Sequence, residues 1–321
     1  MRSTALTIAL VLACSVGAQV PMLWADLRPG RFIVGYLHLL HDSSPVDLWY
    51  PAASPGEAMR FSSYLGERSG ATKAFLERQG LSEEAVAALI EARVYATYEA
   101  APSTERFGLI LVAQGNGQDA ADQAILAEYI ASHGYVVASV PSPMIREQMT
   151  DESQIGVFAE KQADALDEAA RVASRVLNVK TRQIAVIGHS FGARAALLLA
   201  MRRHIRAIVS LDGGIGTATG TSYLEAAPSF RPRAQLPPVL HLYEDLDSFM
   251  RPDFSFLSRL RIEHLRSIRT HDMHHIHFTS YGFAAAMIPP LAAITKAGPD
   301  IKSGVGSVAR EVLHFLQREL G

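Results

Sequence analysis

The residues with the clearest potential for chemistry form the pentapeptide Gly188-His189-Ser190-Phe191-Gly192. It directly follows an apolar run at 183–187 that predicts a buried strand, and directly precedes an amphipathic, helix-length stretch at 191–203. A serine in this strand–turn–helix context is typical of a nucleophile elbow, where a tight turn exposes the hydroxyl. Glycines are needed two positions before and after the serine because side chains there would collide with neighbouring backbone. We therefore predict that Ser190 is a nucleophile beside a helix N-terminus, where negative charge is favoured.

A serine nucleophile needs a general base, and a cluster of histidines lies downstream. Four of them fall within residues 271–278, after the last predicted strand, which is where the histidine belongs in the α/β-hydrolase chain order. The residues alone do not decide which imidazole faces Ser190. Four histidines in seven positions also permit a metal site. A metal would leave Ser190 without a base, so we expect neither a metal nor a cofactor.

An acid that orients the base should lie between the serine and the histidines. Asp212 ends the predicted strand 206–211, and Asp247 follows the predicted strand 238–243, which is the commoner position for the acid in this fold. Either carboxylate could reach a histidine at the same edge of the sheet, and either could instead be an ordinary turn or cap residue. The residues leave both candidates open.

Hydrolysis through a serine nucleophile also needs amides aimed at the developing oxyanion. One is the amide of Phe191, which follows the nucleophile, and the other is expected in the loop after an earlier strand. The predicted strand 108–113 runs into Gln114-Gly115-Asn116-Gly117, the 114–117 loop, whose glycines let amides turn inward. We predict the Asn116 amide as the second donor. The alternative is that this loop is only a flexible turn.

The elements that must position these residues alternate between strand and helix. Short apolar strands are predicted at 46–50, 108–113, 135–140, 183–187, 206–211, 238–243 and 265–270, and helices at 120–133, 156–177, 191–203 and 307–320. This order predicts an α/β fold with a mostly parallel central sheet covered by helices on both faces. Two insertions near 53–100 and 213–236 interrupt it, and we expect them to form substrate walls. The first contains a helix at 82–92 with Ser82 as its cap.

Composition narrows the class of protein. The chain has 321 residues, of which 49% are hydrophobic, and a formal net charge of -2, so it has ample core and no electrostatic footprint for nucleic acid. The single cysteine, Cys14, excludes both a disulfide framework and a cysteine-based zinc site.

The N-terminus has the pattern of a secretory signal. Arg2 precedes an apolar run at 5–13, and small residues follow at 16–18, so we expect a signal peptide at 1–18 and a single domain at 19–321 in a secreted or periplasmic protein. The run is too short to span a membrane, which takes about 20 residues. A second interpretation makes Cys14 the acylated residue of a lipoprotein.

The chain resembles the secreted or lipoprotein α/β-hydrolases related to platelet-activating-factor acetylhydrolase. The resemblance rests on seven segments: Arg28-Pro29-Gly30, Val34-Gly35, Leu48-Trp49-Tyr50-Pro51-Ala52, Glu128 to Ala138, Gly188 to Gly192, Leu211-Asp212-Gly213, and His275 to Ser280. It implies an α/β-hydrolase fold and hydrolysis of esters, with short acyl or phospholipid esters as substrates. The resemblance also favours Asp212 as the acid and His275 as the base, over their rivals Asp247 and His274.

The resemblance further implies Asn116 and Phe191 as oxyanion donors. One departure concerns the 114–117 loop, which in the family begins His-Gly and here begins Gln114-Gly115, so that a bracing side chain is lost. The leading hypothesis is a serine esterase for a small-molecule or lipid ester. The alternatives are a hydrolase of another acyl bond, such as a thioester, amide or polyester, and a catalytically silent binding protein on the same fold.

Overall fold

The computed structural model describes residues 22–41, 44–143, 151, 154–218, 223–225, 227–244 and 250–321. The expected signal peptide 1–18 with Cys14, and the candidate acid Asp247, lie outside the described residues. Within the described part of the chain, no helix is both long and apolar enough to cross a membrane.

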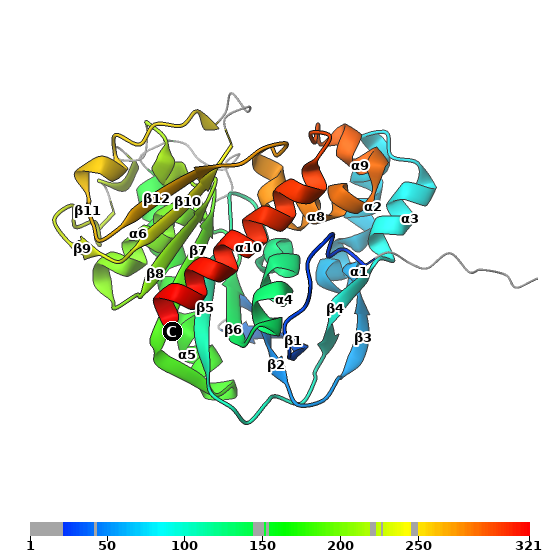
Figure 1. The fold of residues 1–321 in the computed structure, drawn as a ribbon, viewed down its shortest axis with the longest axis horizontal. Coiled ribbons are helices and arrows are strands. Elements are labelled where there is room, and N and C mark those ends of the chain that lie inside the picture. The colour runs from blue at the N-terminus through cyan, green and yellow to red at the C-terminus, as the bar shows by residue number, and fades with distance from the viewer. Residues whose placement is uncertain are drawn as a thin grey trace, which may run out of the picture.

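A ten-stranded sheet forms the centre of the molecule, in the order β12-β10-β8-β7-β5-β6-β2-β1-β4-β3 (Figure 1). Neighbours from β12 to β6 pair in parallel, whereas β2 is antiparallel to both β6 and β1. The strands are β1 Ile33–His41, β2 Ser44–Ala52, β3 Glu57–Arg60, β4 Arg93–Tyr98, β5 Phe107–Ala113, β6 Tyr135–Val140, β7 Val179–His189, β8 Ala207–Leu211, β10 Val239–Tyr243 and β12 Leu265–Arg269. A separate two-stranded sheet pairs β9 Gln235–Leu236 with β11 Arg261–Ile262.

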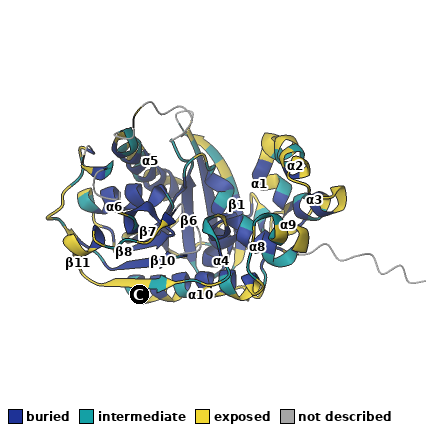
Figure 2. Cartoon of the chain, turned by 90° about the horizontal axis from the view of Figure 1, so that it is seen from above, coloured by how far each residue is buried: buried dark blue, intermediate teal, exposed yellow. Residues whose placement is uncertain are grey.

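Helices cover both faces of the large sheet. On one face lie α4 Ala124–Ser132, α8 Ser280–Met287 and α10 Ile301–Leu320, and on the other lie α5 Gln154–Val176 and α6 Gly192–Arg202 (Figures 1 and 2). The central strand β5 is buried along its whole length because it is covered from both sides. Its side chains alternate between the two layers: Ile110 and Val112 join the α4 and α10 core, and Leu109 and Leu111 join the α5 and α6 core. The predicted fold class is confirmed.

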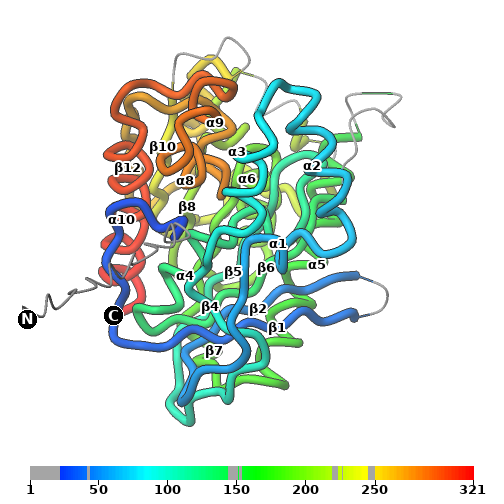
Figure 3. Tube along the Cα trace, turned by 90° about the vertical axis from the view of Figure 1, so that its right-hand side faces the viewer, coloured from blue at the N-terminus to red at the C-terminus, as the bar shows by residue number. Residues whose placement is uncertain are grey.

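The first insertion adds an edge to the sheet. It contains β3, α1 Phe61–Leu65, the turn η1 Gly66–Arg68, α2 Ser69–Arg78, α3 Glu83–Ile90 and β4. Its helices gather at one end of the molecule (Figure 2), and this end faces the viewer in Figure 3. The predicted Ser82 cap is present, since the Ser82 hydroxyl accepts a hydrogen bond from the Ala85 amide at 3.3 Å. Strands β1, β3 and β4 were not predicted; all three lie toward the β3 edge of the sheet, away from the strands that carry the site.

A buried glutamate ties the N-terminal segment and this insertion to α4. The Glu128 carboxylate accepts hydrogen bonds from Trp24 Nε1 at 2.7 Å, the Tyr64 hydroxyl at 2.5 Å, and the amides of Tyr95 and Ala96 at 3.0 and 3.1 Å. Burial raises the pKa of Glu128, against the effect of these donors. Four donors on one carboxylate satisfy a group that would be costly to bury alone.

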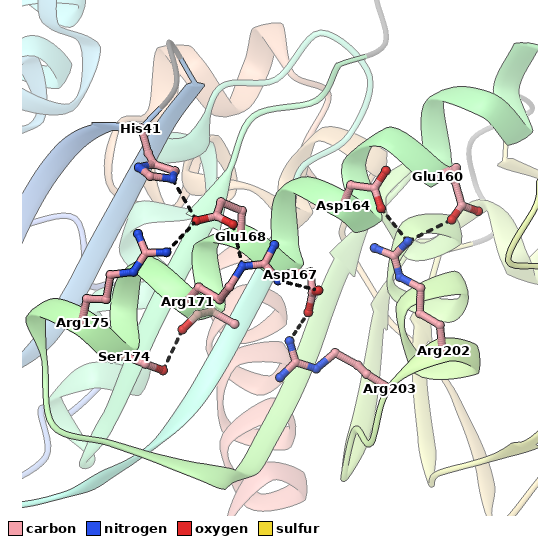
Figure 4. Close-up of polar contacts among 11 residues, drawn as sticks. His41, Glu160, Asp164, Asp167, Glu168, Arg171, Ser174, Arg175, Arg202 and Arg203 are labelled. Carbon is pink, nitrogen blue, oxygen red and sulfur yellow. Dashed lines mark hydrogen bonds and ion pairs between the residues drawn. The ribbon is translucent and has the colours of Figure 1, made fainter.

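Ion pairs join α5 to α6, the helix that follows Ser190. Arg202 pairs with Glu160 at 2.9 Å and with Asp164 at 2.6 Å, and Arg203 pairs with Asp167 (Figure 4). Farther along α5, Glu168 pairs with residues of its own helix and with His41 of β1. These contacts supplement an apolar interface between the two helices, because partly exposed ion pairs contribute little by themselves.

Candidate active site

Ser190 lies in a tight turn between β7 and α6. Its φ is +51°, in the left-handed region that non-glycine residues rarely occupy. A Cβ on Gly188 would lie 2.5 Å from the Ala193 Cα, and one on Gly192 would lie 2.1 Å from the Ala113 carbonyl oxygen. Only glycine fits at either position, which is the physical reason predicted for the two glycines of the motif.

The structure brings Ser190, His275 and Asp212 together in one hydrogen-bonded chain. The Ser190 Oγ lies 2.9 Å from His275 Nε2, and His275 Nδ1 lies 2.6 Å from Asp212 Oδ2. With its proton on Nδ1, the imidazole donates to the carboxylate and presents the Nε2 lone pair to the serine hydroxyl. In this arrangement Nε2 can accept the serine proton, as a general base must.

Asp212 is held rigidly at the end of β8, the strand next to β7. Its amide donates to the Leu242 carbonyl at 2.7 Å, and its Oδ1 accepts from the Glu244 amide at 3.2 Å. Its φ of +42° turns the chain sharply there. Asp212 is 2% exposed, so the negative charge that faces His275 is shielded from solvent.

The rival candidates take different positions. The His274 ring lies 6.0 Å from the His277 ring, and the His274 amide donates to His277 Nδ1 at 2.8 Å. His277 itself is buried, and burial lowers its pKa to about 4, so its ring is neutral. His275 is therefore the histidine of this segment that contacts Ser190. The other candidate acid, Asp247, lies outside the described residues.

The 114–117 loop packs directly against the nucleophile. A Cβ on Gly115 would lie 3.1 Å from the Ser190 Cβ, so the loop backbone passes beside the serine. In the described part of the chain, neither the Asn116 amide nor the Phe191 amide donates a turn or loop hydrogen bond. The Asn116 and Phe191 amides stay the predicted oxyanion donors, and the Gly115 contact shows that the loop carrying Asn116 passes beside Ser190.

Gln114 braces this loop in place of the histidine of the resembled family. Its Nε2 donates to the Ala120 carbonyl and to the Ser139 hydroxyl, both at 2.9 Å, and its own carbonyl accepts from Gln162 Nε2 at 3.0 Å. The expected loss of a bracing side chain is therefore wrong: a glutamine amide supplies the brace. Sequence reasoning also missed Gln118, which contacts the loop through its side chain; a polar residue after a strand carries no signal of its own.

A cavity of about 750 Å³ lies beyond this loop, where residues 119–121 form part of its wall. The remaining wall comes from β1, β2 and the first insertion, including Tyr36, His38, Asp47 and Arg68. A hydrogen bond from His38 Nδ1 to the Asp47 carboxylate raises the pKa of His38. The cavity is large enough for a drug-sized molecule. Among the described residues, no group of three or more His, Cys, Asp or Glu side chains is arranged to hold a metal ion.

Comparison with known proteins relates the chain to one fold. No family model matches the sequence, and neither does any curated protein. Among solved structures, the chain is similar to a ferulic acid esterase from Streptomyces cinnamoneus, with a TM-score of 0.68 and 20% identity over 92% of each chain. The fold is that of the α/β-hydrolases. At this identity the similarity shows the fold and not the substrate, and the finer resemblance to platelet-activating-factor acetylhydrolase stays a prediction.

Proposed function

We propose that this α/β-hydrolase is a serine hydrolase of carboxylic esters. The observation that carries the proposal is the continuous chain from Ser190 Oγ through His275 to Asp212, with distances of 2.9 and 2.6 Å. The name of the ferulic acid esterase, whose fold this chain shares over 92% of its length, supports ester hydrolysis as the reaction class.

In the proposed mechanism, the Ser190 oxygen attacks the acyl carbonyl while His275 Nε2 takes the hydroxyl proton. The buried Asp212 carboxylate stabilises the imidazolium that results. The amides of Asn116 and Phe191 donate to the tetrahedral oxyanion. His275 then returns its proton to the departing alcohol, which leaves Ser190 acylated. Water, deprotonated by His275, attacks the acyl-enzyme, and collapse of the second intermediate releases the acid and restores the serine.

The substrate is proposed to be a small-molecule or lipid ester, including short-acyl and phospholipid esters. We propose that the 750 Å³ cavity, whose wall includes residues 119–121 shortly after the 114–117 loop, receives the acyl or the alcohol part of the ester. We further propose that the protein acts outside the cytoplasm, with residues 1–18 as a cleaved signal and 19–321 as one catalytic domain, or else as a lipoprotein anchored through Cys14.

Hydrolysis of p-nitrophenyl acetate by purified protein tests the proposal. Ser190→Ala should abolish turnover, because the nucleophile is removed, while the melting temperature stays near that of the wild type. Ser174→Ala is the matched control: Ser174 lies on α5 and donates only to the Ala170 carbonyl in its own helix. Full activity in folded Ser190→Ala protein would rule the proposal out.

A further inference from the structure

Gln118 holds the 114–117 loop through its side-chain oxygen. Its Oε1 accepts a hydrogen bond from the Gly115 amide at 2.6 Å and lies 2.8 Å from His189 Nδ1. The Gln118 backbone is fixed as well, since its amide donates to the Gly115 carbonyl at 3.0 Å and its carbonyl accepts from the Ser142 amide at 2.9 Å. The side chain of Gln118 therefore connects the loop to the residue that precedes the nucleophile.

These contacts determine the tautomer of His189. The atom that receives the Gly115 N–H must be the oxygen of the Gln118 amide, so His189 must donate to it from a protonated Nδ1. Burial and the neighbouring His275 hold the pKa of His189 well below its usual range, so the ring is neutral and carries one proton. Its Nε2 then carries no proton, so it cannot donate a hydrogen bond to the His275 carbonyl oxygen, which lies 3.3 Å away. The single N–H of His189 is thus committed to Gln118.

His189 also packs against His275, the residue that contacts the Ser190 hydroxyl. Its ring stacks on the His275 ring, with centroids 4.8 Å apart and planes at 28°. A Cβ on Gly115 would lie 2.6 Å from Gln118 Oε1 and 2.9 Å from His189 Nδ1, so the loop, Gln118 and His189 are in close contact. One buried imidazole therefore touches both the 114–117 loop and His275.

We propose that Gln118 and His189 are positioning residues that set the Asn116 amide against Ser190. The Gly115 amide is occupied by Gln118 Oε1, so the proposal assigns the oxyanion to the next amide along the chain, that of Asn116. This inference rests on the proposed esterase function. In this proposal, a side-chain pair outside the chain of Ser190, His275 and Asp212 holds the oxyanion site in its productive geometry.

Substitutions that remove either half of the contact test the proposal. Gln118→Leu deletes the acceptor, and His189→Phe keeps a ring on His275 but deletes the Nδ1 proton. Each should lower kcat on p-nitrophenyl acetate by about 10- to 100-fold, less than complete loss of an oxyanion donor, with KM within about twofold. The double variant should be no slower than the slower single variant, because both changes break one contact. Gln79→Leu, at an exposed glutamine, is the control.

A second measurement distinguishes a positioning role of Gln118 from a general loss of folding stability. A trifluoromethyl ketone forms a tetrahedral adduct whose oxyanion uses the same amides, so its affinity should fall in proportion to kcat/KM in Gln118→Leu. If His189→Phe melts early, Gln118→Leu alone decides. Wild-type kcat and ketone affinity in Gln118→Leu, or fully multiplicative losses in the double variant, would overturn the proposal. Retained activity in Ser190→Ala would instead refute the esterase function itself, so the two failures are distinguishable.

Discussion

At the scale of single residues, environment separates histidines that are close in sequence. His275 contacts both the Ser190 hydroxyl and the buried Asp212 carboxylate. The His277 ring is buried and accepts a hydrogen bond from the His274 amide. The sequence placed the base within 271–278 but not on one ring, because the 3-10 turn at His275–Phe278 decides which side chain turns toward β7. The resemblance to a known family selected the same histidine that the structure brings to Ser190.

Replacing neighbouring histidines therefore should have unequal effects. His275→Ala should lower kcat by about 10³-fold or more, because the proton acceptor of Ser190 is lost. His274→Ala should keep kcat within a fewfold, since His274 holds the turn through its backbone amide. Steady-state kinetics on p-nitrophenyl acetate with both variants checks this. Comparable losses in the two variants would contradict the assignment of the base.

The acid can be tested in the same way. Asp212→Asn should lower kcat by about 10³- to 10⁴-fold, because an amide no longer fixes the productive tautomer or stabilises the imidazolium. Asp247→Asn is the comparison, and it should stay near wild type. A severe loss in Asp247→Asn with a mild one in Asp212→Asn would transfer the role to Asp247.

At the scale of elements, the strands that carry the site were predictable from the sequence. Strands β1, β3 and β4, toward the β3 edge of the sheet, were not. Buried parallel strands such as β5 and β6 are continuous apolar runs, which periodicity detects. Strand β4 is only partly buried and follows shortly after helix α3, and β3 has one buried residue in four. Their pairing depends on contacts between residues that are far apart in the sequence, including those of the Glu128 carboxylate. A local sequence pattern does not reveal such contacts.

Loss of the Glu128 carboxylate should loosen this edge. Glu128→Ala leaves the Trp24 indole, the Tyr64 hydroxyl and two amides without their acceptor, so the free energy of unfolding should fall by about 3 kcal/mol or more. Urea denaturation measures it, with Glu67→Gln as the control at an exposed glutamate of η1. A loss below about 1 kcal/mol would show that the four contacts do not anchor the edge.

At the scale of the whole molecule, the sheet collects residues that are far apart in sequence at one edge. The 114–117 loop, Ser190 and Asp212 follow three adjacent strands, β5, β7 and β8. The parallel sheet expected from the sequence already implied that these residues lie together, since the carboxyl ends of parallel strands share an edge. It could not predict the choice of Asp212, which depends on a positive φ and on contacts with the strand end of β10.

Buried neutral histidines should make the whole protein sensitive to acid. Burial lowers the pKa of His241 to about 4, against about 6.5 in an unfolded chain, so unfolding takes up a proton between these values. The stability that His241 contributes is present above pH 6.5 and is lost as the pH falls toward 4, by up to about 1.4 kcal/mol per pH unit. His241→Gln should flatten the pH dependence of the unfolding free energy relative to wild type. An unchanged slope, with exposed His204→Gln as control, would contradict this.

The central claim is that His275 and Asp212 activate Ser190 as a nucleophile. A fluorophosphonate probe, which reacts readily only with an activated serine, followed by peptide mass spectrometry, tests it most directly. We predict a single adduct on the peptide that contains Ser190, absent in Ser190→Ala and much slower to form in His275→Ala. An unlabelled Ser190 in folded wild-type protein, or equal labelling in His275→Ala, would contradict the account.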